Sequence, residues 1–294
     1  MKHTAHSEYG TLDKVLIKDF DNAYISQDFI NGQWEELNYL SQPNFEEGQS
    51  EYKTFKNLLT TSGTEVESFP LASDVGMDSI YCRDSSIITD FGVIICAMGK
   101  AGRVTETRAV KEYYLSNGFE LLGEISDGGT IEGGDVAWLD DKTLAVGRTY
   151  RTNDKGISQL KALLGSKGVE VIVADLPHYK GKSDVFHLMS ILSPVDKDLA
   201  VVYSPLMPIR FRELLINRGF NLVEVPDEEF ESMGCNVLAL APRNCLMVDG
   251  NPLTKARLQE AGAKVTAYKG EEISVKGGGG PTCLTRPLLR VLDV

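Results

Sequence analysis

The chain has little of the material from which several common kinds of site are built. Its five cysteines are an odd number without CxxC spacing, and only four histidines occur among 294 residues. Neither a disulfide framework nor a zinc cluster is therefore expected. Cys96 and Cys245 sit inside apolar runs, and we predict that they are small core residues.

The sequence also lacks long apolar runs and an excess of basic residues. Its start has no apolar core of about 7–15 residues, which a signal peptide needs, and no later run has the length of a membrane span. The formal net charge is −12, which argues against a nucleic-acid partner. We therefore expect a cytoplasmic protein with a small-molecule partner and no membrane or nucleic-acid partner. Homo-oligomer formation stays open.

What the sequence does contain is a repeated alternation of helical and strand patterns. Helical periodicity ending at or near a glycine occurs in residues 46–63, 104–118, 153–168, 209–219 and 253–262. An apolar strand follows each helix, at residues 65–70, 119–126, 169–177, 220–229 and 264–270. A turn and a second strand come next, within residues 78–89, 130–139, 184–192, 234–242 and 277–289. The alternation predicts an α/β protein.

These units recur at a period of about 50 residues, which is typical of internal repeats. No proline-rich or low-complexity linker interrupts them. The sequence therefore predicts one catalytic domain over residues 1–294, in which five ββαβ-like units form a ring around a central site.

One polar or nucleophilic residue stands near the same place in the second strand of every unit. These residues are Asp84, Glu132, His187, Asn236 and Cys283, at successive spacings of 48, 55, 49 and 47 residues. In a closed ring, equal phase brings such side chains to one end of the axis. Burial of these groups is costly unless each finds a partner, so we expect a functional site there.

Cys283 follows four consecutive glycines in GGGGPTC. Because glycine permits positive φ and lets a ligand approach the backbone closely, we predict that Cys283 is a nucleophile. The alternative is a small buried thiol. His187, in DVFHLMSIL, is the predicted acid and base because its phase matches that of Cys283; without the match it would be an ordinary core or surface histidine.

Two acidic motifs complete the predicted site. TIEGGDVAW contains Glu132 and Asp135, and it also fits a hairpin turn. DSIYCRD contains Asp78, Arg83 and Asp84, and it also fits a surface ion pair. Fixed carboxylates suit a guanidinium, whose N–H donors form a planar fork.

Chemistry at a guanidinium carbon needs a closely held thiolate, because the charge of the group is delocalised. Neither a metal nor a cofactor is predicted. The complete set of predicted substrate-binding residues is Asp78, Arg83, Asp84, Arg103, Asp135, Arg151 and Asn236. Arg103 and Arg151 are candidates for a substrate carboxylate, although each also fits a surface or helix-end charge.

With these motifs the chain resembles the guanidine-modifying enzymes, or penteins, which are fivefold pseudosymmetric α/β propellers. The family includes arginine deiminases, dimethylarginine dimethylaminohydrolases and arginine amidinotransferases. The resemblance spans nearly the whole chain. It rests on RD at Arg83 and Asp84, EGGD from Glu132, HL at His187 and the glycine run before Cys283.

The resemblance implies that Cys283 attacks the guanidinium carbon and expels ammonia or an alkylamine, which leaves a covalent thiouronium. It implies that His187 protonates the leaving amine and then helps water to attack. Asp84 and Glu132 would hold the guanidinium nitrogens, and Glu132 would also orient His187. The positions that hold the amino-acid end of the substrate in dimethylarginine hydrolases are matched by Asp78, Arg103 and Arg151. No cofactor is implied.

One departure bears on the substrate. Arginine deiminases and amidinotransferases typically carry an aspartate two residues after the histidine, where this chain has Met189. HLMS is closer to the dimethylarginine hydrolases, whereas GGGGPTCLT and CNVLALAP are closer to the arginine deiminases. The sequence predicts hydrolysis of a methylated arginine to citrulline and an alkylamine. Arginine deimination, amidino transfer and noncatalytic arginine binding stay open.

Overall fold

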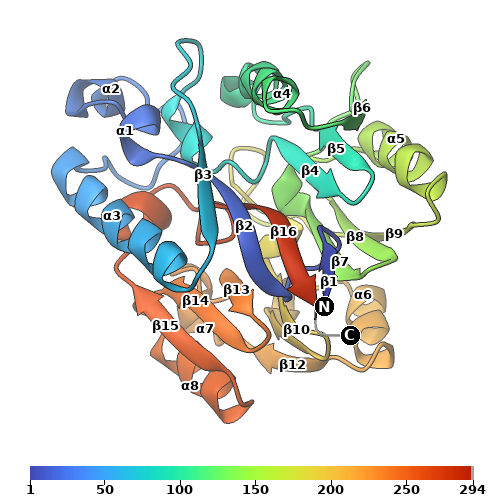
Figure 1. Cartoon of the computed structure of the whole chain (residues 1–294). Helices are drawn as coiled ribbons and strands as arrows, with labels where there is room; N and C mark the ends of the chain where they lie inside the picture. The colour runs from blue at the N-terminus through green and yellow to red at the C-terminus, as the bar shows by residue number, and fades with distance from the viewer. Residues whose placement is uncertain (293–294) are drawn as a thin grey trace.

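Five small β-sheets make up the fold of the computed structural model, which describes residues 1–292 (Figure 1). Four sheets have three strands each: β4 (Ser86–Thr89), β5 (Gly92–Ile95) and β6 (Leu121–Glu124); β7 (Val136–Asp140), β8 (Thr143–Arg148) and β9 (Glu170–Asp175); β10 (Leu192–Asp196), β11 (Leu199–Val202) and β12 (Asn221–Glu224); β13 (Val237–Ala241), β14 (Asn244–Val248) and β15 (Lys264–Tyr268). The fifth sheet has the order β1 (Lys2–Thr4), β16 (Arg286–Leu292), β2 (Thr11–Lys18) and β3 (Glu65–Phe69).

Each three-stranded sheet is one ββαβ unit. The first two strands pair antiparallel, and the third pairs parallel to the second after a helical crossover. The predicted ββαβ units are thus confirmed. The sequence patterns did not separate the middle strands β5, β8, β11 and β14, because they are short and buried like the strands that precede them.

The crossover helices are α3 (Phe45–Thr61), α4 (Glu106–Ser116), α5 (Asp154–Gly165), α6 (Ile209–Asn217) and α8 (Pro252–Glu260), and Figure 1 shows them around the outside of the sheets. In α5 the buried residues Ile157, Leu160 and Leu164 form one apolar stripe. The helix begins at Asn153, whose Oδ1 accepts a hydrogen bond from the Gly156 amide at 2.8 Å. Short helices α1 (Phe20–Ala23), α2 (Gln27–Asn31) and α7 (Asp227–Phe230) complete the set.

Contacts between successive sheets close a ring. An isolated bridge joins Ala97 to Ile131, and β7 contacts β10, β10 contacts β13, β13 contacts β2, and β16 contacts β4. The two ends of the chain share the fifth sheet, because β16 pairs antiparallel with both β1 and β2. The predicted fivefold arrangement is therefore confirmed, whereas the single catalytic domain over residues 1–294 stays a prediction.

The sequence analysis placed the five equivalent polar residues within strands. In the structure they lie just before the strands instead. Each occupies a turn or an irregular residue next to β4, β7, β10, β13 or β16. A strand would alternate its side chains between two faces, whereas a turn at the strand entry can aim every side chain toward the same end of the ring.

No helix within residues 1–292 is long and apolar enough to cross a membrane.

Candidate active site

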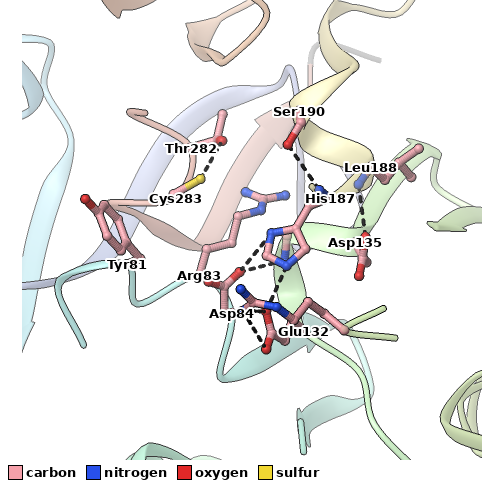
Figure 2. Close-up of polar contacts among 12 residues, drawn as sticks. Tyr81, Arg83, Asp84, Glu132, Asp135, His187, Leu188, Ser190, Thr282 and Cys283 are labelled. Atoms are coloured by element: carbon pink, nitrogen blue, oxygen red, sulfur yellow. Dashed lines mark hydrogen bonds and ion pairs between the residues drawn. The ribbon is translucent and has the colours of Figure 1, made fainter. Parts of the chain in front are cut away.

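A cavity of about 310 Å³ opens where these turns meet, and Cys283, His187, Asn236, Arg151 and Met189 contribute to its wall. Figure 2 shows the imidazole of His187 facing the carboxylates of Asp84 and Glu132. The structure thus brings four of the predicted residues, Cys283, His187, Asn236 and Arg151, to the cavity wall, and the two carboxylates contact His187 without being part of that wall among residues 1–292.

Cys283 is held by the turn that precedes β16. Its amide donates to the Gly280 carbonyl oxygen at 3.0 Å, and Asn236 Nδ2 donates to its Sγ at 3.3 Å. The Asn236 side chain is itself fixed, because its Oδ1 accepts hydrogen bonds from the amide and hydroxyl of Thr282 at 3.0 and 2.9 Å. Burial, reinforced by the Asp84 charge, raises the pKa of the Cys283 thiol, although the Asn236 hydrogen bond opposes the change.

His187 is 3% exposed and sits between two acids. Its Nε2 lies 2.8 Å from Glu132 Oε2, and its Nδ1 lies 4.0 Å from Asp84 Oδ1. Burial by itself lowers the pKa of His187, but the charges of Asp135, Asp84 and Glu132 outweigh it and raise the pKa to about 9. The site therefore holds a protonated imidazole at neutral pH.

Glu132 has no exposed surface, and its Oε1 accepts two backbone hydrogen bonds, from Gly99 and Lys100, each at 2.9 Å. Its Oε2 faces His187, and Arg151 Nη1 lies 3.3 Å from the same oxygen. Although burial opposes ionisation, the hydrogen bond and charge of His187 lower the pKa of Glu132. Glu132 is thus an anion that fixes the position and the charge of His187.

Asp84 is held from the side opposite the cavity. Its Oδ1 accepts the Gly134 amide at 2.9 Å, and its Oδ2 lies 2.6 Å from Arg103 Nη1. Arg103 is bound in turn by both oxygens of Glu106, each at 2.8 Å. Within residues 1–292 Arg103 does not line the cavity, so its placement does not support the predicted contact with substrate. It positions Asp84 instead.

Asp135 anchors the segment that carries His187. Its Oδ1 accepts the Leu188 amide at 3.0 Å and its Oδ2 accepts the Thr149 hydroxyl at 2.7 Å. Burial raises the pKa of Asp135 to about 6. The side chain is fully buried and makes no part of the cavity wall among the described residues, so it too positions the site without reaching the predicted substrate.

Arg83 and Asp78 also lie outside the wall of this cavity, as far as residues 1–292 are concerned. Arg83 is 1% exposed and pairs with Glu8 at 2.7 Å, which is a structural ion pair rather than the predicted substrate contact. Asp78 pairs at 2.5 Å with Lys100, which does line the cavity. The sequence analysis missed Lys100, which lies three residues before Arg103 in GKAGR, and it missed Glu106, the first residue of α4, three residues after Arg103.

The glycines before Cys283 have a different role from the one predicted for all four. A Cβ on Gly277 or Gly279 would collide with Tyr81, and one on Gly280 would lie 2.5 Å from Asn236 Oδ1. Gly278 has a φ of +73°. The run is therefore required mainly for close packing against Tyr81 and Asn236, and only Gly277 and Gly278 border the cavity.

Within residues 1–292 one group of side chains has the geometry to hold a metal ion. Single ligand atoms of Asp84, Glu132 and His187 all lie within 4.8 Å of one another. Backbone amides and Arg103 already engage the two carboxylates, and a protonated imidazole offers no lone pair to a metal. The set fits an acid and base centre better than a metal site.

Comparison with known proteins finds relatives that cover nearly the whole chain. A protein of Bacillus subtilis described as uncharacterized protein YkgA is 27% identical over 98% of this chain and 96% of its own length. Among solved structures, a dimethylarginine dimethylaminohydrolase (DDAH) from Pseudomonas aeruginosa, a cysteine-to-serine mutant complexed with citrulline, has a TM-score of 0.77 at 20% identity and covers 94% of this chain and 98% of its own. The product-bound N-terminal domain of ArgZ, an arginine dihydrolase from Cyanobacteria, has a TM-score of 0.79 at 18% identity and covers 94% and 97%.

A family model matches almost the whole described chain. Residues 20–290 match the family described as N,N dimethylarginine dimethylhydrolase, eukaryotic. That span includes the residues of the cavity wall, from Leu37 to Cys283, and the four three-stranded sheets, whereas β1 and β2 of the fifth sheet precede it. The chain therefore belongs to this family, within the guanidine-modifying penteins.

Proposed function

We propose that this protein hydrolyses the guanidino group of a methylated arginine and releases citrulline and an alkylamine. The coarser assignment, a pentein hydrolase that cleaves a C–N bond of a linear amidine, follows from the family. The substrate is the finer inference, and it rests on the wall of the cavity.

Met189 is the observation that supports a methylated substrate. It lies two residues after His187, lines the cavity and is 2% exposed. A thioether packs well against alkyl groups and accepts hydrogen bonds only weakly. A carboxylate at that position would instead bind an unsubstituted guanidinium nitrogen. The side of the cavity next to the imidazole therefore suits a nitrogen that carries methyl groups.

The first step is the attack of Cys283 on the guanidinium carbon. In the empty cavity the thiol has a raised pKa, so a bound guanidinium, a cation next to the sulfur, would lower it and favour the thiolate. The thiol proton passes to water. The S–C bond then forms as the C=N π electrons move onto nitrogen, which leaves a tetrahedral carbon, and Asn236 keeps the sulfur in place through its hydrogen bond.

The second step is loss of the amine. The protonated His187 gives its proton to the departing nitrogen, and the C–N bond breaks to leave a thiouronium on Cys283. The neutral imidazole then accepts a proton from water, whose oxygen attacks the same carbon. The C–S bond breaks, the sulfur leaves as a thiolate, and the protonated urea gives one proton to that thiolate and becomes citrulline. Glu132 and Asp84 stabilise the imidazolium before and after the transfer.

A second candidate is hydrolysis of arginine itself. It is favoured by the likeness to the arginine dihydrolase ArgZ and by a Limosilactobacillus reuteri arginine deiminase that is 24% identical over 93% of this chain. The two candidates share the thiouronium and differ in the amine that leaves.

The test is a substrate panel of arginine, monomethylarginine, dimethylarginine and agmatine, with citrulline, ammonia and alkylamine assayed separately. We expect dimethylarginine to be consumed fastest and to release dimethylamine in equal amount with citrulline. Faster turnover of arginine, with ammonia as product, would overturn the choice of substrate.

Cys283→Ser provides the test of the nucleophile. We expect turnover to fall by at least about a thousandfold, because a serine hydroxyl is not activated where a thiol is, while the ligand still binds in calorimetry. Asn236→Ala is the matched variant that keeps the sulfur but removes its hydrogen bond, and we expect a smaller loss. Unchanged turnover in Cys283→Ser would rule the mechanism out.

A further inference from the structure

A second cavity, of about 260 Å³, lies away from the guanidine site. It is enclosed by the C-terminal ends of β2 and β3, the loop after β3 and one face of α4. Figure 1 shows that loop beside α4. Its apolar wall consists of Phe69, Leu71, Val75, Ala109, Val110 and Tyr113.

The wall of this cavity is fixed to the body of the protein. The Thr105 hydroxyl donates to the Asp74 carbonyl oxygen at 2.6 Å, and Arg108 forms an ion pair with the Asp74 carboxylate. These contacts join the loop after β3 to the start of α4. The space between them is therefore a built feature of the fold.

Two polar groups in the cavity lack the partners that their burial requires. Lys18, the last residue of β2, is 4% exposed, yet within residues 1–292 its ammonium donates only to the Pro70 carbonyl oxygen and forms no ion pair. An ammonium has further donors to satisfy, and an uncompensated buried charge is costly. The Ser79 hydroxyl, 7% exposed, has no hydrogen-bond partner among the described residues.

The acidic neighbours of Lys18 form no ion pair with it within residues 1–292, and Glu112, an acid of the same wall, is exposed. Glu106 lines the same cavity, but both of its oxygens bind Arg103. Asp19 pairs with Lys56 at 2.6 Å. Burial lowers the pKa of Lys18, which is the expected response of a cation that lacks an anion.

We propose that this cavity is a second ligand site, which takes a small monocarboxylic acid with an apolar body. The carboxylate would pair with the Lys18 ammonium and accept from the Ser79 hydroxyl, and the apolar body would lie against Phe69, Val110 and Tyr113. The cavity volume limits the ligand to one about the size of hexanoate or benzoate.

The test is titration calorimetry of the whole protein with benzoate and, as the uncharged match, benzamide. Both measurements are made with citrulline present in excess, so that the guanidine site is blocked. We expect benzoate to bind at one site and benzamide to bind at least about tenfold more weakly, because it cannot pair with the ammonium. Equal binding of the two probes, or no binding of benzoate, would overturn the proposal.

Variants locate the site. Ala109→Phe fills the cavity and Lys18→Met removes the charge while keeping the apolar stem, so we expect each to weaken benzoate binding by at least about tenfold. Lys276→Met, which removes a lysine from the wall of the other cavity, is the control and should bind benzoate normally. Loss of binding in Lys276→Met alone would place the probe in the guanidine site and overturn the proposal.

Stability gives a second measurement for Lys18. Because its ammonium is buried without a counter-ion, Lys18→Met should melt at the same temperature as the parent protein or higher. A clear drop in melting temperature would mean that Lys18 is already satisfied in the empty protein, and it would contradict the site.

Discussion

At the scale of single residues, the arrangement of charge around His187 decides the chemistry. The imidazole is buried, which by itself favours the neutral form, yet three carboxylates keep it protonated. Burial, together with the charge of Asp84, also raises the pKa of the neighbouring Cys283 thiol, which favours its neutral form. At neutral pH the site thus holds an imidazolium and a neutral thiol, and in the proposed mechanism a bound cation favours the thiolate.

The raised pKa of His187 has a consequence for stability. The folded protein keeps this proton up to about pH 9, whereas the unfolded chain loses it near pH 6.5. Between these values the native state binds more protons, so the free energy of unfolding should fall as the pH rises from about 6.5 to about 9. Urea denaturation measured across this window should show a steeper loss of stability in the parent than in His187→Asn. Parallel curves for the two proteins would contradict the assignment.

In the proposed function the choice of substrate depends on Met189, so its replacement should change that choice. We expect Met189→Asp to shift the ratio of kcat/KM for arginine over dimethylarginine by at least about tenfold toward arginine. The reason is that a carboxylate accepts hydrogen bonds from an unsubstituted guanidinium nitrogen, whereas a dimethylated nitrogen has no N–H to donate. Met189→Leu, which keeps an apolar group of similar volume, should retain the preference for dimethylarginine. An equal ratio in the two variants would show that residue 189 does not face the leaving group.

At the scale of elements, the site is built from the turns that precede β4, β7, β10, β13 and β16. The first turn of α4 supports Asp84, because Glu106 forms an ion pair with Arg103 and Arg103 forms an ion pair with Asp84. Burial raises the pKa of Glu106 to about 7, although Arg103 opposes the change. A helix end thus fixes a carboxylate that lies on another segment.

Glu106→Gln tests this support. The glutamine amide has only one oxygen to accept hydrogen bonds from the Arg103 guanidinium, so Arg103 and Asp84 should move. We therefore expect kcat/KM to fall by about tenfold to a hundredfold. Glu112→Gln, at an exposed position of the same helix, is the control and should be neutral. Circular dichroism melts separate the two explanations: a loss of activity that tracks a large loss of stability would mean that Glu106 acts only in folding.

At the scale of the whole molecule, the buried Arg290 connects segments of the ring that are far apart in the sequence. Arg290 has no exposed surface and donates to the carbonyl oxygens of Gly10 at 2.6 Å and Ala239 at 2.8 Å. It therefore links the C-terminal strand β16 to the N-terminal segment and to β13. Burial lowers the pKa of Arg290 to about 10.

Arg290→Ala should open this junction. Two buried carbonyl oxygens lose their donor and a cavity remains, so we expect a loss of about 2–4 kcal/mol in the free energy of unfolding. Arg210→Ala, at an exposed position on α6, should change stability by less than about 0.5 kcal/mol. A neutral effect of Arg290→Ala would show that the ring does not depend on this contact.

Much of the site could be predicted from the sequence because a repeat converts spacing into position. Units of similar length place Asp84, Glu132, His187, Asn236 and Cys283 at equivalent points, and the ring then brings them together. The division of labour among the charged residues could not be predicted in this way. Arg83 and Arg103 were both predicted to bind substrate, yet they pair with Glu8 and Glu106. The basic residues that line the cavity include Lys100 and Arg151 instead.

The sequence by itself determined the repeat, the α/β class and the residue types at the site, because periodicity, glycine positions and spacing are local properties. Only the tertiary structure decided which side chains reach the cavity and which stand behind it. That choice depends on ion pairs between distant segments, such as Arg83 with Glu8, and on the packing of Gly279 against Tyr81. Such contacts arise only when the ring closes, since the groups that compete for each charge are then brought within reach.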